Sequence, residues 1–200
     1  MWHITDILDI KNLLGKNRLQ PIPQYPADQL VIRSKDTSFA FNITFPTTLN
    51  VQYTYNGVTL TATYDNSHSG FTELLNVDIE TDIIFTSPNS LQYADIPSGE
   101  RYSFFAPNNT IQNFWYQGLK YADVVDLRNA SSLASVGGTN NNQTSVVYVG
   151  DTTAGIRVAA NAIINDSIYS DGVLWLKPGT TEAAHIRSVA ENKGWRVYDL

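Results

Sequence analysis

A short apolar strand followed by turn residues recurs from about residue 80 to the C-terminus. The last apolar residues of these segments are Phe85, Phe105, Leu127, Val149, Leu176 and Leu200, and successive intervals between them are 20, 22, 22, 27 and 24 residues. Intervals of this length are typical of solenoids, in which one strand of each repeat stacks on the strand of the next. The sequence therefore predicts a ladder of parallel strands over residues 81–200.

The two longest intervals also have helical periodicity. Apolar residues form one face over residues 157–168, ahead of an Asp171-Gly172 turn, and again over residues 181–193, ahead of Gly194. Parallel strands need a long crossover connection, which is usually a helix. We therefore expect two strand-helix-strand units in the last part of the ladder.

Residues 28–80 alternate apolar and polar side chains with a period of two, which is typical of strands. Asn56-Gly57 lies between two such runs and predicts a hairpin, because a type I′ turn requires positive φ at both central residues. The five runs predict a small antiparallel unit that is loosely immunoglobulin-like. With the ladder, they place the chain in the α+β class, rich in β structure.

Residues 1–27 are predicted to form an arm. Apolar side chains recur there at helical spacing before Gly15, and three prolines then favour an extended chain. A single short helix is marginally stable in water. Its apolar face should therefore dock, either on the body of the same chain or on another subunit. The residues that we expect to dock are Trp2, Ile4, Ile7, Leu8 and Leu14.

Composition excludes several kinds of partner. The net charge of −6 offers no basic stripe for a phosphate backbone, so we expect no nucleic acid. The absence of cysteine excludes disulfides and thiolate metal sites. No run of 18 apolar residues occurs, and the first residues lack the basic and apolar regions of a secretory signal. We therefore expect no membrane insertion.

The residues that could support catalysis are isolated. His3, His68 and His185 have no cysteine or second histidine at metal-ligand spacing. His68 lies in a segment rich in turn residues, and no nucleophile elbow accompanies it. These histidines therefore predict neither a metal site nor a catalytic triad.

Three carboxylates at alternate positions would share one face of a strand. Asp78, Glu80 and Asp82 in that arrangement could serve glycoside hydrolysis or bind Ca²⁺. A solvated strand face, or a charged edge that discourages strand pairing, is much more common. We therefore expect no catalytic residues, no metal and no cofactor, and hence no enzyme.

Alignment of the ladder strands predicts a binding face. If the anchors point into the core, the residues before them point outward, and parallel strands bring such residues to about 4.8 Å from one another. This row of aromatics flanked by acids could stack on sugars or bind a protein. The alternative is that the N-terminal part of the chain covers the row. Its members are Ile84, Phe104, Asp126, Tyr148, Trp175 and Asp199.

Two stretches of the ladder resemble a known repeat. Residues 125–133, Val-Asp-Leu-Arg-Asn-Ala-Ser-Ser-Leu, are similar to a strand-and-loop consensus, and residues 172–176 with 190–197 look like a helix and a closing strand. Together they resemble the irregular, BspA-like leucine-rich-repeat modules of bacterial surface proteins and of phages that infect such bacteria. The resemblance covers residues 80–200 at most. It implies interaction with other macromolecules rather than chemistry.

The sequence therefore predicts a non-enzymatic structural or attachment protein. Its expected location is a phage virion, as a head or tail fibre or a capsid decoration protein. The arm would anchor it to a capsid or tail protein or to another copy of the chain, and the ladder would present the binding face. The alternative is a carbohydrate- or protein-binding module at a bacterial cell surface.

Overall fold

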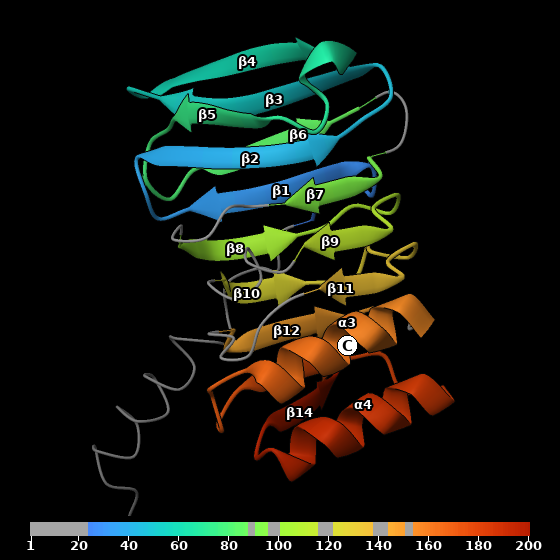
Figure 1. The fold of residues 1–200 in the computed structure, drawn as a ribbon. Helices are drawn as coiled ribbons and strands as arrows, with labels where there is room; N and C mark the ends of the chain where they lie inside the picture. The colour runs from blue at the N-terminus through green and yellow to red at the C-terminus, as the bar shows by residue number, and fades with distance from the viewer. Residues whose placement is uncertain (1–23, 88–90, 96–100, 116–121, 138–143, 151–153) are drawn as a thin grey trace, which may run out of the picture.

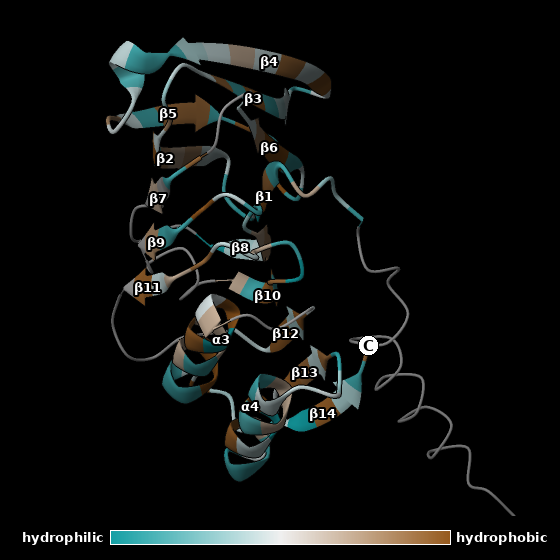
Figure 2. Ribbon diagram, turned by 90° about the vertical axis from the view of Figure 1, so that its right-hand side faces the viewer, coloured by the Kyte–Doolittle hydropathy of each residue, from teal (hydrophilic) through white to brown (hydrophobic). Residues whose placement is uncertain are grey.

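The computed structural model describes residues 24–87, 91–95, 101–115, 122–137, 144–150 and 154–200. Two β-sheets lie face to face, and two helices continue the layer of the smaller sheet (Figures 1 and 2). Most of the core lies between these layers. The prediction of a β-rich α+β fold is confirmed.

The larger sheet, sheet A, has nine strands and the smaller, sheet B, has five. In spatial order, sheet A contains β14 (Arg196–Asp199), β13 (Val173–Leu176), β12 (Val146–Val149), β10 (Ala122–Asp126), β8 (Tyr102–Ala106), β1 (Gln29–Ser34), β6 (Asp82–Thr86), β3 (Thr48–Tyr55) and β4 (Val58–Asp65). Sheet B contains β11 (Ser135–Gly137), β9 (Asn113–Trp115), β7 (Tyr93–Asp95), β2 (Ser38–Thr44) and β5 (Thr72–Asn76).

The C-terminal half of sheet A is parallel from β8 to β14. The chain alternates between the layers: β9 and β11 lie in sheet B and pair in parallel with each other. The helices α3 (Ala154–Asp166) and α4 (Thr181–Asn192) then occupy the place of sheet B strands. Each helix is the crossover between two parallel strands of sheet A, as the sequence predicted.

The other half of sheet A is antiparallel, and it begins with a strand from far away in the sequence. β1 lies between β6 and β8 and is antiparallel to both. The prediction that β6 is the first rung of the parallel ladder, next to β8, is therefore wrong. A repeat interval depends on local sequence, whereas the insertion of β1 depends on pairing between distant segments.

The hairpin of β3 and β4 has the predicted turn. Asn56 and Gly57 have φ values of 53° and 73°, which suit a type I′ turn. The carboxylate of Asp78, from the loop before β6, accepts hydrogen bonds from both backbone N–H groups, at 2.9 and 2.7 Å. The turn is therefore held by its own geometry and by a tertiary contact. A short 3-10 helix, η1 (Asn66–His68), follows β4.

One continuous apolar core extends from the antiparallel half to the C-terminal helices. Phe41 of β2 and Phe85 of β6 meet edge to face, with ring centroids 5.0 Å apart, and Phe105 of β8 and Phe114 of β9 do so at 4.7 Å. Aliphatic side chains of the short parallel strands and the apolar faces of α3 and α4 fill the rest. Burial of this surface is the main source of stability.

The last residues of the predicted arm cover part of the outer face of sheet A, the face turned away from sheet B. The ring of Tyr25 packs on Phe104, with centroids 5.7 Å apart, and its hydroxyl donates to Asp82 at 2.6 Å. Arg33 donates to the same carboxylate at 2.8 Å. Residues 24–27 therefore dock on the body of their own chain. The arm positions Trp2, Ile4, Ile7, Leu8 and Leu14 lie outside the described residues.

Tyr25 should make stability depend on alkaline pH. Burial, together with the hydrogen bond to Asp82, raises its pKa to about 12, whereas an unfolded tyrosine titrates near 10. Below pH 10 the phenol is protonated in both states, and between 10 and 12 only the unfolded state loses the proton. The free energy of unfolding should therefore fall across that interval. Urea denaturation from pH 9 to 12 measures the fall, which Tyr25→Phe should reduce and the exposed Tyr55→Phe should not; equal slopes for Tyr25→Phe and wild type would contradict this account.

Candidate binding face

Three aromatic side chains line up on the outer face of sheet A. Parallel pairing places Tyr148 beside Trp175 and Trp175 beside Tyr198. On each of these strands the residue before the aromatic side chain points into the core. The ring centroids are 6.3 Å and 4.8 Å apart, with interplanar angles of 18° and 28°. We call Tyr148, Trp175 and Tyr198 the aromatic row. All three rings are partly exposed.

Stacking within the row decides what it presents to a partner. Trp175 lies between the two tyrosines, so each face of the indole is turned toward a neighbouring ring. Trp175 therefore presents its ring edge to a partner rather than an open indole face. The buried indole N–H of Trp175 has no acceptor among the described residues. A buried donor without an acceptor lowers the stability of the folded state by about 1–3 kcal/mol. Such donors are unusual in folded proteins.

An ion pair closes one end of the row. Arg128 donates to both carboxylate oxygens of Asp126, at 2.8 and 2.5 Å, and its guanidinium carbon lies 5.8 Å from the ring centroid of Tyr148. Asp126 is only 5% exposed, so it is not the exposed acid that the sequence predicted. A carboxylate this deeply buried needs such a partner. Burial raises the pKa of Tyr148, and the charge of Asp126 adds to the rise, so Tyr148 carries no phenolate near neutral pH.

Two predicted members of the face lie elsewhere on sheet A. Phe104 pairs with Val124 rather than with Asp126, and Tyr25 covers it. Ile84 lies beyond β1, where it pairs with Val31. β1 therefore separates Ile84 from the rest of the predicted row, and Tyr25 covers Phe104. The prediction of a continuous exposed row from Ile84 to Asp199 is wrong.

The last predicted member, Asp199, does not lie in the row, so its prediction is wrong. It pairs with Leu176, whose side chain is in the core, and it forms an ion pair with Arg187 of α4. Tyr198 takes its place in the row. The predicted anchor of this strand is Leu200, the last apolar residue, whereas Val197 is the residue that packs against the core. Alternation within the last strand was the signal that would have found Tyr198.

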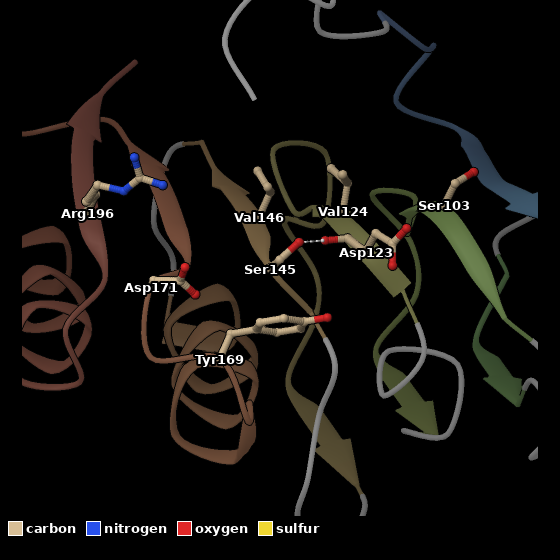
Figure 3. Close-up of a pocket in the computed structure, with 8 residues that line it drawn as sticks. All are labelled: Ser103, Asp123, Val124, Ser145, Val146, Tyr169, Asp171 and Arg196. Atoms are coloured by element: carbon tan, nitrogen blue, oxygen red, sulfur yellow. Dashed lines mark hydrogen bonds between the residues drawn. The ribbon is translucent and has the colours of Figure 1, made fainter. Parts of the chain in front are cut away.

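A hollow lies on the same face, at the amino-terminal ends of the strands (Figure 3). It has a volume of about 550 Å³, and Val124 and Val146 contribute its apolar part. Ser145 donates to the carbonyl of Asp123 at 3.1 Å. The polar lining of the hollow consists of two carboxylates, one guanidinium, one phenol and two hydroxyls: Asp123, Asp171, Arg196, Tyr169, Ser103 and Ser145. Sequence reasoning found none of these residues, because separate strand ends bring them together.

The three alternating carboxylates have separate partners and do not share a strand face. Asp78 holds the hairpin turn, Glu80 accepts from Ser103 at 2.6 Å, and Asp82 binds Arg33 and Tyr25. Residues 77–81 form a connection in which Glu80 has a φ of 61°, and β6 begins only at Asp82. Asp78, Glu80 and Asp82 therefore do not lie on one strand, so the predicted shared face does not form. Each carboxylate instead holds a separate contact within the fold.

His68 lies beside a serine and an aspartate without forming a triad. Ser67 donates to Asp65 Oδ1 through its backbone N–H at 3.0 Å, and the His68 Nδ1 lies 3.1 Å from the same oxygen. Ser67 Oγ also approaches Nδ1, at 3.3 Å, whereas a triad holds the serine and the acid on opposite ring nitrogens. Hydrogen bonds from Ser67 and His68 lower the pKa of the Asp65 carboxyl. Asp65 therefore acts as the N-cap of η1.

No family model matches the sequence, and comparison with curated proteins and with solved structures also found no match. In the part of the chain that the structure describes, no three His, Asp or Glu side chains are grouped to hold a metal ion. Over the same residues, no helix is long and apolar enough to cross a bilayer. His185 lies on α4, and its Nε2 is 3.1 Å from Asn161 of α3.

Proposed function

We propose that this chain is a non-enzymatic structural or attachment protein that binds a protein partner through the aromatic row. The observation that carries the proposal is the row itself: three stacked, partly exposed rings on the outer face of a short parallel ladder. Aromatic side chains offer large contact areas at low entropic cost and are enriched in binding hot spots. Short parallel strands hold them rigidly at fixed spacing.

The stacking of the rings favours a protein over a sugar. A sugar ring packs flat against an open aromatic face, and both faces of Trp175 are turned to other rings. Ring edges, two phenol hydroxyls and the neighbouring Arg128 suit a mixed apolar and polar protein surface instead. Arg, Tyr and Trp are the residue types that recur at the centres of such interfaces.

The setting that we propose is a phage virion, in which the chain serves as a head or tail fibre or a capsid decoration protein. This proposal is supported by the resemblance of residues 80–200 to repeat modules of bacterial surface proteins and their phages. The proposed anchor is the arm, on a capsid or tail protein or on another copy. A map of neighbouring genes tests the setting: capsid and tail genes beside this one support it, and export or glycan-utilisation genes count against it.

Removal of the central ring should weaken partner binding. Products of neighbouring virion genes would be purified as probes, and their affinity for the full chain measured by biolayer interferometry. We expect Trp175→Ala to weaken binding at least tenfold, roughly the loss typical of a hot-spot residue. Thermal melting would show that the variant is folded, since Trp175 lies on the sheet surface rather than in the core.

Val158→Ala is the matched control. Val158 is 41% exposed on α3, in the other layer of the molecule, so its removal should leave affinity within about twofold. Equal affinity of wild type and Trp175→Ala for a probe that binds would remove the aromatic row from the proposal. A similar loss for both variants would point to a general effect on the fold.

A carbohydrate-binding module of a bacterial surface protein is the second candidate, and the hollow favours it. Its carboxylates, hydroxyls, guanidinium and phenol are groups that bind sugar hydroxyls, and its two valines could contact the apolar side of a sugar ring. A glycan array distinguishes the candidates. Binding that Asp171→Asn abolishes and Trp175→Ala leaves intact would favour the hollow and this second function.

A further inference from the structure

The strand at the far edge of sheet A is long and regular and carries none of the residues that commonly discourage pairing with another strand. β4 is eight residues long and pairs only with β3 among the described strands, with no shift of register along its length. Proteins usually protect an exposed edge with lysine, proline, a bulge or a very short strand. The sequence Val-Thr-Leu-Thr-Ala-Thr-Tyr-Asp of β4 has none of these, and its only charged residue is the last, Asp65.

The hairpin geometry shows which backbone groups this edge offers. The pair that flanks a two-residue turn is hydrogen-bonded, and hydrogen-bonded and non-hydrogen-bonded pairs then alternate. Tyr55 and Val58 flank the Asn56-Gly57 turn. Thr59, Thr61 and Thr63 therefore direct their N–H and C=O groups away from β3, toward the free edge.

The side chains of β4 on the core side extend beyond the cover of sheet B. Ala62 lies opposite Val51, which is buried in the core, so Leu60 and Val58 project from the same face. They are nevertheless 37% and 56% exposed. Apolar side chains next to an open backbone edge are the combination that a second strand would cover.

Charge around this edge favours a copy of the same chain. Residues 48–76 contain no lysine or arginine and only two carboxylates, Asp65 and Glu73, although the chain as a whole carries a net charge of −6. A strongly charged foreign segment would find no complementary groups here. A second copy brings an equally uncharged strand, and antiparallel pairing keeps the two Asp65 carboxylates at opposite ends.

We infer that β4 pairs with β4 of a second copy in antiparallel fashion, about a two-fold axis at Thr61. Only a register that opposes edge-facing residues forms hydrogen bonds, and the centred one places Thr61 opposite Thr61 and Thr59 opposite Thr63. Cross-strand threonine pairs stabilise such a sheet. In the same register Leu60 meets Ala62 and Val58 meets Tyr64, so the exposed apolar side chains cover one another.

This interface joins two nine-stranded sheets into one and does not cover the aromatic row. β4 and β14 are the opposite edges of sheet A, so the aromatic rows of the two copies lie at the far ends of the joined sheet. A two-fold axis perpendicular to the sheet keeps both rows on the same side. A dimer of this kind attaches at two points, which strengthens binding to a repetitive surface without any new contact.

Sedimentation velocity of the full chain over a series of concentrations tests the pairing. Wild type should show reversible dimerisation, and Thr61→Lys should weaken it at least about tenfold, because two lysines then face each other across the axis. Gln52→Lys is the matched control. Gln52 pairs with Thr61 from β3, so the same charge on the same face lies about three strand spacings from its copy, beyond the screening length, and dimerisation should persist.

Thr61→Pro provides a second, uncharged variant. It removes the edge-facing N–H without removing a hydrogen bond to β3, so it should yield a folded monomer with a melting temperature close to that of wild type. Trp175→Ala should dimerise like wild type, which separates this interface from the aromatic row. A wild-type chain that stays monomeric at all concentrations, or a Thr61→Lys variant that dimerises as wild type does, would overturn the inference.

Discussion

Gly155→Ala should lower the free energy of unfolding by about 3 kcal/mol or more, the upper range for added volume at a close-packed site. A Cβ atom at position 155 would lie 1.2 Å from the carbonyl oxygen of Leu133 and 2.3 Å from its carbonyl carbon. Both are backbone atoms, so a change of side-chain rotamer relieves nothing. The loop cannot yield easily, because Leu133 is buried and Ala134 N–H donates to the carbonyl of Gln112 at 2.8 Å.

The position of Gly155 explains why its effect should be large. It lies in the first turn of α3, where the layer of sheet B changes from strands to helices, and α3 packs on the loop before β11. Urea denaturation followed by circular dichroism measures the loss. Asn165→Ala, on the exposed side of the same helix, should change stability by less than about 0.5 kcal/mol. Wild-type stability in Gly155→Ala would show that α3 does not approach this loop so closely.

Phe85→Ala should destabilise the protein by about 3–5 kcal/mol, the usual cost of a large cavity in an aromatic core. Phe85 is fully buried on β6, and its ring centroid lies 5.0 Å from that of Phe41 and 6.1 Å from that of Phe39. Both neighbours lie on β2 of sheet B and would lose contacts that they cannot regain without moving the backbone. Leu74→Ala, at a position 67% exposed, is the control and should have little effect.

The same variant tests whether the two halves of the molecule unfold together. The core that contains Phe85 extends without a break to Trp195 near the C-terminus. Hydrogen exchange should therefore show that Phe85→Ala reduces protection in α4 by nearly as much as in β6. Wild-type protection in α4, with loss confined to the antiparallel half, would instead divide the chain into two separately folding units.

Elements set by local sequence were predicted well. The Asn56-Gly57 turn requires backbone conformations that these two residues adopt readily, and the observed φ values match it. The two helices lie within three residues of their predicted limits, because apolar periodicity and the stop at Gly194 are local signals. The same holds for the strands at 146–149 and 173–176, which lie where the repeat intervals placed them.

Elements that depend on distant pairing were not predicted. β1 enters the sheet between β6 and β8, although about 50 and 70 residues separate it from them in the sequence. Tyr25 reaches across to Phe104 and to the carboxylate of Asp82. No periodicity reports such contacts, because their stability comes from surfaces that meet only in the folded chain. They interrupt the predicted row at Phe104 and Ile84.

The sequence by itself determined the local elements, the α+β class and the parallel pairing that aligns Tyr148 with Trp175, since short strands with regular spacing have few other ways to bury their apolar sides. Tertiary structure alone decided what those elements present. The register of the last strand replaced Asp199 with Tyr198, and Arg128 covered the charge of Asp126. It also left β4 at the opposite edge with β3 as its only neighbour among the described strands, because each strand's neighbours depend on the whole sheet rather than on its own residues.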